Sequence, residues 1–565
     1  MSYTYTEQET DAAVQARPTL PLPIINHGVV YTKPWVIELM LDQAGIHQDK
    51  DLAQLTMIEP AAGDGAFVAA LAERLARSCQ IHARDLASCS TSIIAFELSP
   101  HAAQQSRLAI TSRLVGLGVE EMLAWGLASS WVQTGDFLLS APTLPKADLV
   151  IGNPPYVRLE EIDPKTVSTY RREYPTMVGR ADLYVAFYEA ALRGLKPGGR
   201  CVFICADRWM LNQYGAELRR LVTSGYAVES IIEMHTVGAF EEEVDAYPAV
   251  TILRKGTQGP AVVARAEAGI EAMPTDDLVT YLKAIQAGER VPRLPALRAA
   301  RVDGWFEGDA PWPAYSPERL ALLKHLEAEF YPLESPGTGT KVGIGVATGA
   351  DAVFITKDAT VVEAERLLPL AMAADTRSGY VQWSGHYLVN PWQVDGLTSL
   401  AKAPRLAQYF EEHGDHLRGR HVGKKNPHAW YRTIDRVDLA LTGRPKLLIA
   451  DIKERLNPVL DTGEYYPHHN LYWVTSASWD MEVLGGLLLS DVAQFFVECY
   501  GVRMRGGYLR FQAQYLRRIR VPRPQDVTTK QADALRAAYQ ARDRQAATAV
   551  ALEVYKIGGI PKGDD

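Results

Sequence analysis

The tetrapeptide Asn153-Pro154-Pro155-Tyr156 places an amide, two prolines and an aromatic ring directly after the apolar run 147–152. The prolines stiffen this backbone, because proline fixes its own φ and restricts the residue before it. The Asn153 side-chain oxygen and the Pro154 carbonyl could then accept both N–H bonds of a planar amine, while Tyr156 stacks on its ring. This arrangement predicts alkylation of an aromatic amine, by positioning alone and without a metal. The alternative is a rigid turn that ends a strand.

A second candidate is the turn Glu59-Pro60-Ala61-Ala62-Gly63-Asp64-Gly65, between the apolar run 56–59 and a helical pattern over 66–77. Gly63 and Gly65 would let the backbone turn sharply and approach a ligand closely. No Gly-Lys-Ser/Thr follows, so the turn is not a phosphate loop. The dinucleotide-binding pattern also fits poorly, because the third glycine is absent. The turn therefore predicts a cradle for another cofactor.

Two acidic positions follow later strands and suit an adenosine. Glu97 ends the run 93–97, and its carboxylate could accept both hydroxyl groups of a ribose. Asp136 could bind an exocyclic amine, and Phe137 could cover a purine face. The alternatives are an exposed acid at a strand end for Glu97, and a turn with a core phenylalanine for Asp136-Phe137.

The elements that must position these residues alternate along 56–255. Short β-branched runs predict six strands, at 56–59, 93–97, 147–152, 200–206, 228–233 and 249–254. Helical periodicity occupies 66–77, 181–195 and 215–224, and Lys196-Pro197-Gly198-Gly199 is expected to end the second of these helices. This alternation is typical of an α/β fold with a doubly wound, Rossmann-like sheet.

The composition excludes several classes of protein. The chain has 565 residues, of which 47% are hydrophobic and 22% charged, with a formal net charge of −8. These values exclude disordered and collagen-like proteins. The five cysteines have no metal-type spacing, so no metal site is predicted, and a reducing compartment follows. There is no uninterrupted run of 18 apolar residues and no basic, apolar leader, so we expect a protein that is neither secreted nor membrane-spanning.

Positive charge is concentrated in the C-terminal half of this acidic chain. Residues 402–455 contain twelve Lys or Arg against seven Asp or Glu, and residues 501–525 contain seven Arg and no acid. Basic clusters with aromatic residues between them suit contacts to phosphates and bases of DNA. The candidate contact residues are Lys424, Lys425, Trp430, Tyr431, Arg503, Arg505 and Arg510. The alternative for each cluster is a solvated cationic face.

Together these motifs resemble the gamma-class, TaqI-like DNA adenine-N6 methyltransferases. The resemblance rests on the order of the motifs: the N-terminal Gly28 to Pro34, then the Glu59 to Gly65 turn, Glu97, Asp136-Phe137, the tetrapeptide and finally 182–184. It implies S-adenosylmethionine as cofactor, with Tyr31, Thr32, Pro34, Glu59, Pro60, Ala61, Gly63, Gly65, Glu97, Asp136, Phe137 and Asn153 contacting it. It also implies Phe240 as a second aromatic that holds an extruded adenine, against the alternative of a packed core residue.

The resemblance also divides the chain. It implies an N-terminal tail over 1–27, a methyltransferase domain over 28–255, a connector over 256–335, a mixed α/β target-recognition domain over 336–525 and a helical tail over 526–565. The segments 343–351, 353–355, 444–449 and 470–473 resemble parts of the family's recognition domain. Helical patterns are expected over 276–286 and 530–555.

The implied function is sequence-specific transfer of a methyl group to N6 of a flipped adenine in double-stranded DNA, as the modification enzyme of a restriction-modification system. The implied setting is the prokaryotic cytoplasm, with the enzyme a monomer on DNA and the cognate endonuclease a separate protein. Two alternatives remain at this point. One is an amino-methyltransferase that acts on RNA or protein glutamine, and the other is a catalytically silent DNA specificity subunit.

Overall fold

The computed structural model describes residues 30–242, 247–313, 317–501 and 508–561. The chain divides into two compact units, residues 1–314 and residues 315–565. The first is named the catalytic unit and the second the recognition unit, after the roles that the sequence predicts for them. The predicted N-terminal tail, 1–27, lies outside the described residues.

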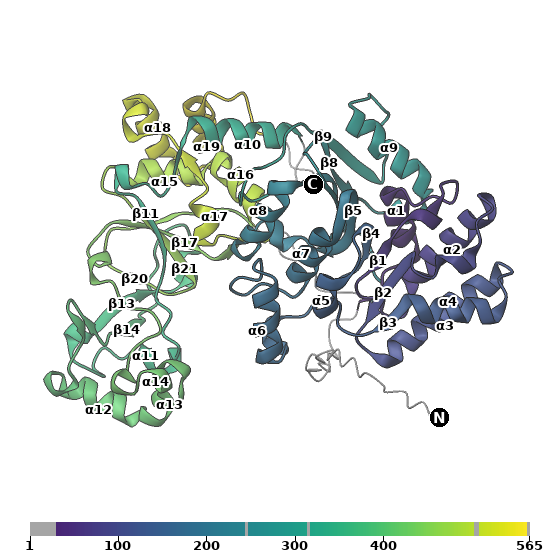
Figure 1. The fold of residues 1–565 in the computed structure, drawn as a ribbon. Coiled ribbons are helices and arrows are strands. Elements are labelled where there is room, and N and C mark those ends of the chain that lie inside the picture. Colours follow the sequence, from purple (N-terminus) through teal and green to yellow (C-terminus); the bar gives the residue numbers. More distant parts are fainter. Residues whose placement is uncertain (1–29, 243–246, 314–316, 502–507, 562–565) are drawn as a thin grey trace, which may run out of the picture. The chain divides into compact units, whose positions relative to one another are not determined.

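The catalytic unit is built on a sheet that has nine strands within the described residues (Figure 1). Their order across the sheet is β3-β2-β1-β4-β5-β7-β6-β8-β9. The strands are β1 (Met57–Glu59), β2 (Ile93–Glu97), β3 (Val132–Thr134), β4 (Ala147–Gly152), β5 (Leu195–Ala206), β6 (Tyr226–Glu233), β7 (Pro248–Lys255), β8 (Ala261–Ala266) and β9 (Leu297–Val302). The strand order reverses between β1 and β4, and ligands of open α/β sheets bind at such a reversal, beyond the carboxyl ends of the strands.

Helices cover both faces of this sheet, and each face has its own apolar core. One core contains buried residues of α1 (Pro34–Ala44), α2 (Ala66–Ile81), α3 (Pro100–Gly116), α4 (Glu121–Trp131) and α9 (Thr275–Ala287). The other contains residues of α5 (Phe137–Ser140), α6 (Pro164–Glu173), α7 (Tyr184–Gly194) and α8 (Ala216–Gly225). The predicted doubly wound, Rossmann-like α/β fold is therefore confirmed.

All six predicted strands are present, but the sequence analysis was wrong in three details. It missed β3, which has only three residues. It expected Lys196 to Gly199 to end a helix, whereas α7 ends at Gly194 and these residues belong to β5. It placed a connector over 256–335, whereas β8 and β9 extend the sheet and α9 packs on it, so that this unit continues to residue 314. Prolines between these short elements obscured their periodicity.

The recognition unit contains two four-stranded sheets within its described residues. Their orders are β11-β21-β17-β19 and β12-β14-β13-β20. The first consists of β11 (Lys341–Ile344), β17 (Lys446–Ala450), β19 (Val459–Asp461) and β21 (Leu471–Thr475). The second consists of β12 (Ile355–Thr356), β13 (Leu367–Ala371), β14 (Tyr387–Val389) and β20 (Tyr466–Pro467). Together with the helices of this unit, these sheets confirm the predicted mixed α/β composition of the C-terminal half.

Short ribbons and helices complete the recognition unit. Two-stranded ribbons are formed by β10 (Tyr331–Pro332) with β23 (Arg520–Val521), β15 (Trp392–Gln393) with β16 (Gly396–Leu397), and β18 (Ile452–Lys453) with β22 (Leu509–Arg510). The helices are α10 (Pro317–Glu329), α11 (Asp351–Phe354), α12 (Pro404–Glu412), α13 (Gly414–Gly419), α14 (His421–Lys425), α15 (Met481–Leu489), α16 (Asp491–Tyr500), α17 (Ala513–Leu516), α18 (Thr529–Gln540) and α19 (Arg544–Tyr555).

The C-terminal segment is helical but is not a separate tail. It forms α18 and α19, which pack with α15 inside the recognition unit. The single helix expected over 530–555 is broken at Arg542, whose φ is +56° and whose guanidinium donates to the Pro458 carbonyl at 2.8 Å. No glycine or proline marks this break, so the sequence pattern did not reveal it.

No single helix among the described residues is long and apolar enough to cross a membrane. By length and composition, α15 and α16 meet that test only as a pair, with a 62° bend between them.

Candidate active site

The carboxyl ends of β1 and β4 bring the two main sequence motifs together. These strands pair in parallel, with Met57 opposite Leu149 and Ile58 opposite Val150. Glu59 therefore ends β1 beside Gly152, which immediately precedes Asn153. A β-carbon at Gly152 would lie 3.5 Å from Glu59 Cγ, so the strand ends approach within van der Waals contact. The glycine-rich turn and the tetrapeptide thus lie at one edge of the sheet, at its strand-order reversal.

The glycine-rich turn is fixed against the end of β2. The Ala62 N–H donates to the Phe96 carbonyl at 2.8 Å, and the Gly63 N–H donates to Glu97 Oε2 at 2.9 Å. Gly65 has φ +98°, and a β-carbon there would lie 2.7 Å from Ser106 Cα. Only glycine combines this left-handed conformation with so close a contact, so the turn depends on it.

Glu59 is a buried acid at the base of this turn. Its residue is 1% exposed, and its Oε2 has no hydrogen-bond partner among the described residues. Burial raises the pKa of Glu59 well above its ordinary value, and the charges of Asp64 and Glu97 raise it further. A buried carboxyl group in acidic surroundings is suited to a cationic ligand, which would stabilise its ionised form.

Asn153 is held by a segment from the beginning of the described chain. Its Nδ2 donates to the Val30 carbonyl at 2.9 Å and to Thr32 Oγ1 at 3.3 Å. Since a carbonyl can only accept, the amide nitrogen must face Val30. The Asn153 Oδ1 atom is buried and has no hydrogen-bond partner within the described part of the chain. The site thus presents a fixed, unused acceptor oxygen.

The segment that anchors Asn153 is itself paired with residues around Phe240. Thr32 forms an isolated antiparallel bridge with Phe240, Lys33 N–H donates to the Ala239 carbonyl at 3.0 Å, and Glu241 N–H donates to the Tyr31 carbonyl at 2.9 Å. Three sequence regions, around residues 32, 153 and 240, therefore meet in one place. The sequence analysis chose residues from all three, but it missed the Val30 carbonyl, because a backbone contact has no side-chain signature.

The two predicted base-holding aromatics are neighbours. The ring centroids of Tyr156 and Phe240 lie 6.2 Å apart, with an interplanar angle of 76°. Phe240 is 5% exposed and belongs to an apolar core. The Tyr156 hydroxyl is buried without a partner in the described residues, and burial raises its pKa well above the usual value. Because the rings meet edge to face, a base cannot lie between two parallel faces in this arrangement.

Glu97 and Asp136 follow neighbouring strands, as expected, and both already accept hydrogen bonds. Glu97 accepts from the Gly63 and Ser99 N–H groups, at 2.9 and 2.8 Å. Asp136 begins α5 by accepting from Leu138 N–H and also accepts the Tyr170 hydroxyl at 2.5 Å; its burial raises its pKa. Each carboxylate oxygen has two lone pairs, so further acceptance remains possible. The Tyr170 contact had no signal in the sequence.

Phe137, an expected adenosine contact, is packed in an apolar core. Its ring is 4% exposed and packs against Phe96, with centroids 5.8 Å apart, and against Phe187, at 5.6 Å. This packing fits the core alternative, and contact of the Phe137 ring with a purine stays a prediction. The remaining predicted contact residues, Tyr31, Pro34, Pro60 and Ala61, lie in the two segments that frame Glu59 and Asn153.

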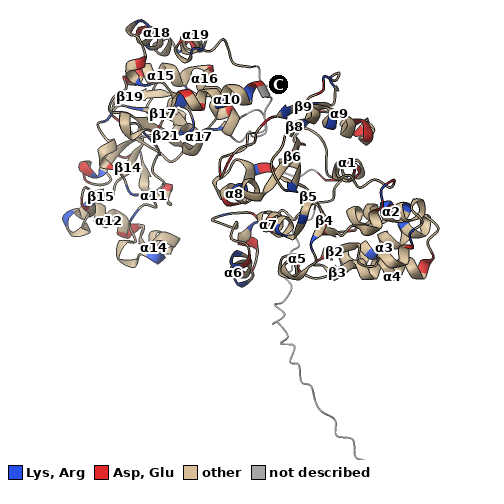
Figure 2. Ribbon diagram, turned by 45° about the horizontal axis from the view of Figure 1, so that its top comes forward, with Lys and Arg blue, Asp and Glu red and all other residues tan. Residues whose placement is uncertain are grey.

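The recognition unit brings part of the predicted basic cluster to its surface. Lys424 and Lys425 are exposed on α14. Figure 2 colours the Lys and Arg positions of the α14 ribbon blue. Trp430 is half-buried, and the Arg418 guanidinium lies 3.9 Å from its ring centroid. Tyr431 is half-buried and donates its hydroxyl to the Thr398 carbonyl at 2.9 Å. These four residues are close together in the sequence, but Trp430 and Tyr431 also pack against an apolar core.

The arginines of the second basic cluster are only partly described. Arg510 forms an ion pair with Asp451 at 2.6 Å. The predicted contact residues Arg503 and Arg505 lie outside the described residues. Arg420, which the sequence analysis did not select, donates to the carbonyls of Thr348, Trp430 and Arg432 at 2.8 to 3.0 Å. Charge patterning alone could not separate this structural arginine from exposed ones.

Known proteins share both halves of this chain. The family model of the Eco57I restriction-modification methylases matches residues 143–240, and that of the TaqI-like C-terminal specificity domain matches residues 405–521. The chain is 40% identical over 547 residues to the Type II methyltransferase M.XhoI of Xanthomonas vasicola, covering 94% of this chain and 97% of that protein. It is 41% identical over 539 residues to the Type II methyltransferase M.PaeR7I of Pseudomonas aeruginosa, covering 94% and 92%.

The chain belongs to the Type II methyltransferases of restriction-modification systems. It is a DNA methyltransferase, and its methyl donor is S-adenosylmethionine. The family assignment decides for DNA against RNA or protein glutamine, and for an enzyme against a silent specificity subunit.

A solved structure supports the fold of this methyltransferase. The Type IIL restriction-modification enzyme MmeI, determined in complex with DNA, has a TM-score of 0.55 and 12% identity to this chain, and the match covers 94% of this chain and 74% of that one.

Proposed function

We propose that this methyltransferase transfers a methyl group to the N6 amine of an adenine flipped out of double-stranded DNA. The observation that carries the proposal is the Oδ1 atom of Asn153, which is buried, fixed through its amide nitrogen and without a partner among the described residues. An acceptor in that state is suited to an N–H group of a substrate.

Methylation of an aromatic amine requires the enzyme to localise the lone pair on the amine nitrogen. Asn153 Oδ1 and the Pro154 carbonyl would accept the two N–H bonds of the amine, with Pro155 stiffening the loop. The lone pair then forms the new N–C bond, the electrons of the S–CH3 bond remain on sulfur, and one N–H proton leaves to solvent. Fixed acceptors of this kind act by electrostatic preorganisation.

The amine must leave the base stack to reach Asn153, because the acceptor oxygen is buried at a strand end. Tyr156 would stack on the flipped base, and Phe240 would contact an edge of the base, given the edge-to-face arrangement of the two rings.

The glycine-rich turn after β1 suits S-adenosylmethionine. S-adenosylmethionine, when bound, supplies a methyl group on a positively charged sulfur. Glu59, whose Oε2 has no partner in the described residues, would attract its positive charge, and Glu97 would accept its ribose hydroxyl groups. The other residues proposed to surround the cofactor are Tyr31, Thr32, Pro34, Pro60, Ala61, Gly63, Gly65, Asp136, Asn153 and the backbone of Phe137.

The cysteines support an amine as the target rather than a ring carbon. A pyrimidine carbon is a poor nucleophile, so its methylation calls for an enzyme nucleophile that first adds to the ring. All five cysteines are buried, and burial raises the pKa of the Cys201 and Cys205 thiols well above the usual value. Such thiols are inert.

In the recognition unit, Lys424, Lys425, Trp430, Tyr431 and Arg510, with Arg503 and Arg505, are proposed to contact DNA. The exposure of the two lysines on α14 and their aromatic neighbours support this. We further propose that the enzyme acts as a monomer in the prokaryotic cytoplasm, with its cognate endonuclease a separate chain.

The test is to identify the methylated nucleoside. Unmethylated duplex DNA is incubated with the enzyme and methyl-labelled S-adenosylmethionine, digested to nucleosides and separated. Label in N6-methyladenine is expected, and DNA from cells that express the enzyme should accept none. Label in N4-methylcytosine would contradict adenine as the target base but agree with an amine as the methylated group. Label in 5-methylcytosine would contradict both claims.

A further inference from the structure

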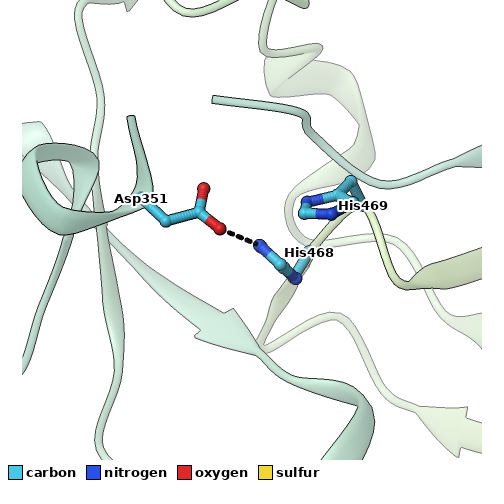
Figure 3. A group of neighbouring side chains, drawn as sticks. All are labelled: Asp351, His468 and His469. Atoms are coloured by element: carbon cyan, nitrogen blue, oxygen red, sulfur yellow. Dashed lines mark hydrogen bonds and ion pairs between the residues drawn. The ribbon is translucent and has the colours of Figure 1, made fainter. Parts of the chain in front are cut away.

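Three potential metal ligands meet in the recognition unit, far from the catalytic residues in sequence. They are Asp351, at the start of α11, and His468 and His469, in the connection between β20 and β21 (Figure 3). One ligand atom from each lies within 4.8 Å of the others. The sequence analysis predicted no metal site, because Asp351 and His468 are 117 residues apart and no cysteine is involved.

The main chain ties the two histidines to the segment that precedes Asp351 in the sequence. Val346 forms a parallel bridge with His468, and the His469 N–H donates to the Val346 carbonyl at 3.1 Å. A β-carbon at Gly345 would lie 2.1 Å from the His468 carbonyl oxygen, so only glycine allows this approach. The backbone therefore fixes His468 and His469 against residues 345–346, a few residues before Asp351.

The side-chain distances suit a shared ion. His468 Nε2 and Asp351 Oδ2 are 3.3 Å apart, which is longer than a usual N–H···O hydrogen bond. Two donors that each lie about 2.0–2.1 Å from one tetrahedral ion are separated by roughly 3.3–3.4 Å. The observed spacing therefore suits two ligands of one ion as well as it suits a long direct hydrogen bond.

The two imidazoles also leave polar atoms unsatisfied. His468 has a side chain 3% exposed, and the Nδ1 atoms of His468 and His469 are buried without a hydrogen-bond partner in the described residues. The two rings lie 4.0 Å apart between centroids. An ion held through His468 Nε2 would leave His468 Nδ1 unchanged, but His469 could bind that ion through its own unpaired Nδ1.

The surroundings resemble those of a metal-binding carboxylate. Asp351 Oδ1 accepts from the buried Thr348 hydroxyl, and the Thr348 carbonyl accepts from Arg420 Nη1 at 3.0 Å. Such outer contacts orient a ligand.

We propose that Asp351, His468 and His469 bind a divalent ion of the zinc class. Two imidazoles and one carboxylate are ligands of Zn²⁺, whereas Ca²⁺ and Mg²⁺ prefer oxygen ligands throughout. Three protein ligands leave a fourth position, and the Asp351 side chain, which is 48% exposed, gives solvent access to it. The ion ties the start of α11 to the β20–β21 connection, two segments of the recognition unit.

The experiment uses the full chain, stripped of metal with a chelator and titrated with Zn²⁺ in a calorimeter. One equivalent is expected to bind the wild type. His469→Gln and Asp351→Asn should each weaken binding by at least about 100-fold, because even the loss of an outer contact can cost that much. His416→Gln, which changes an exposed histidine on α13, is the matched control and should bind like the wild type.

Substitution with Co²⁺ gives an independent readout, because a tetrahedral site with nitrogen ligands produces intense visible absorption bands. These bands should appear in the wild type and in His416→Gln and be lost in His469→Gln. Circular dichroism of each variant checks that it is folded. The proposal is overturned if the metal-free wild type binds no Zn²⁺, or if both ligand variants bind it as tightly as the wild type.

Discussion

Two sets of buried polar groups, one in each unit, are used differently. In the catalytic unit, Glu59 Oε2 and Asn153 Oδ1 are buried without partners among the described residues. In the recognition unit, Lys446 and Asp461 are 0% and 1% exposed, form a 2.7 Å ion pair, and Lys446 also donates to the carbonyls of Leu441 and Arg444. Burial alone is therefore no sign of function. The unsatisfied atom indicates a ligand, and the satisfied one indicates a structural role.

The largest expected effect is on stability, through the buried ion pair of Lys446 and Asp461. Lys446→Ala leaves the Asp461 carboxylate buried without its cation, which should lower the free energy of unfolding of the recognition unit by about 3–5 kcal/mol. Urea denaturation measures this loss. Lys425→Ala, at an exposed lysine, should change it by less than about 0.5 kcal/mol. Equal losses in the two variants would contradict the distinction.

A pair of glycines separates backbone strain from close contact. Gly65 and Gly118 have φ of +98° and +86°, but a β-carbon at Gly65 would meet Ser106 Cα at 2.7 Å, whereas Gly118 has open space. Gly118→Ala should cost about 1–2 kcal/mol of stability and spare cofactor affinity. Gly65→Ala should cost more and weaken S-adenosylmethionine binding, as calorimetry would show. Unchanged affinity in Gly65→Ala would remove the turn from the cofactor site.

Glu59 should make both protein stability and cofactor affinity depend on pH. Its raised pKa means that its contribution to stability is present below the unfolded-state pKa and is lost as pH rises through the folded-state pKa. A cationic ligand favours the ionised carboxylate, so S-adenosylmethionine affinity should rise with pH up to that pKa, by at most about tenfold per pH unit.

Glu59→Gln removes the titrating group while keeping the side-chain shape. Binding to this variant should be weaker at high pH and should lose the pH dependence, measured by calorimetry from pH 5 to 9. A wild type whose affinity does not change with pH would exclude Glu59 as the partner of the cofactor's charge.

The smallest effect concerns the exposed lysines. The double variant Lys424→Ala with Lys425→Ala should weaken DNA binding several-fold and reduce the dependence of log K on log salt by about 2, or about 1 per lost phosphate contact. Arg510→Ala should change the slope less, because Arg510 is paired with Asp451. Fluorescence anisotropy from 50 to 300 mM salt compares them. A larger change in the salt slope for Arg510→Ala than for the double lysine variant would contradict this prediction.

The catalytic unit could be predicted from sequence much further than the recognition unit. Its strands are apolar runs, and functional residues follow them directly, as Asn153 follows β4 and Glu97 ends β2. In the recognition unit, two-residue strands have no periodicity to detect. The sequence also could not show the Phe137 packing or the meeting of Asp351 with His468, because both depend on distant segments.

The central claim is that the Asn153 oxygen accepts the reacting amine. Single-turnover methyl transfer by Asn153→Ala, at saturating S-adenosylmethionine, tests it most directly, with Gln104→Ala on the exposed part of α3 as control. The account predicts a rate about 10²–10³-fold lower than wild type, as for loss of one transition-state hydrogen bond, in a folded enzyme that still binds the cofactor. A rate within about threefold of the wild type, under the same conditions, would contradict it.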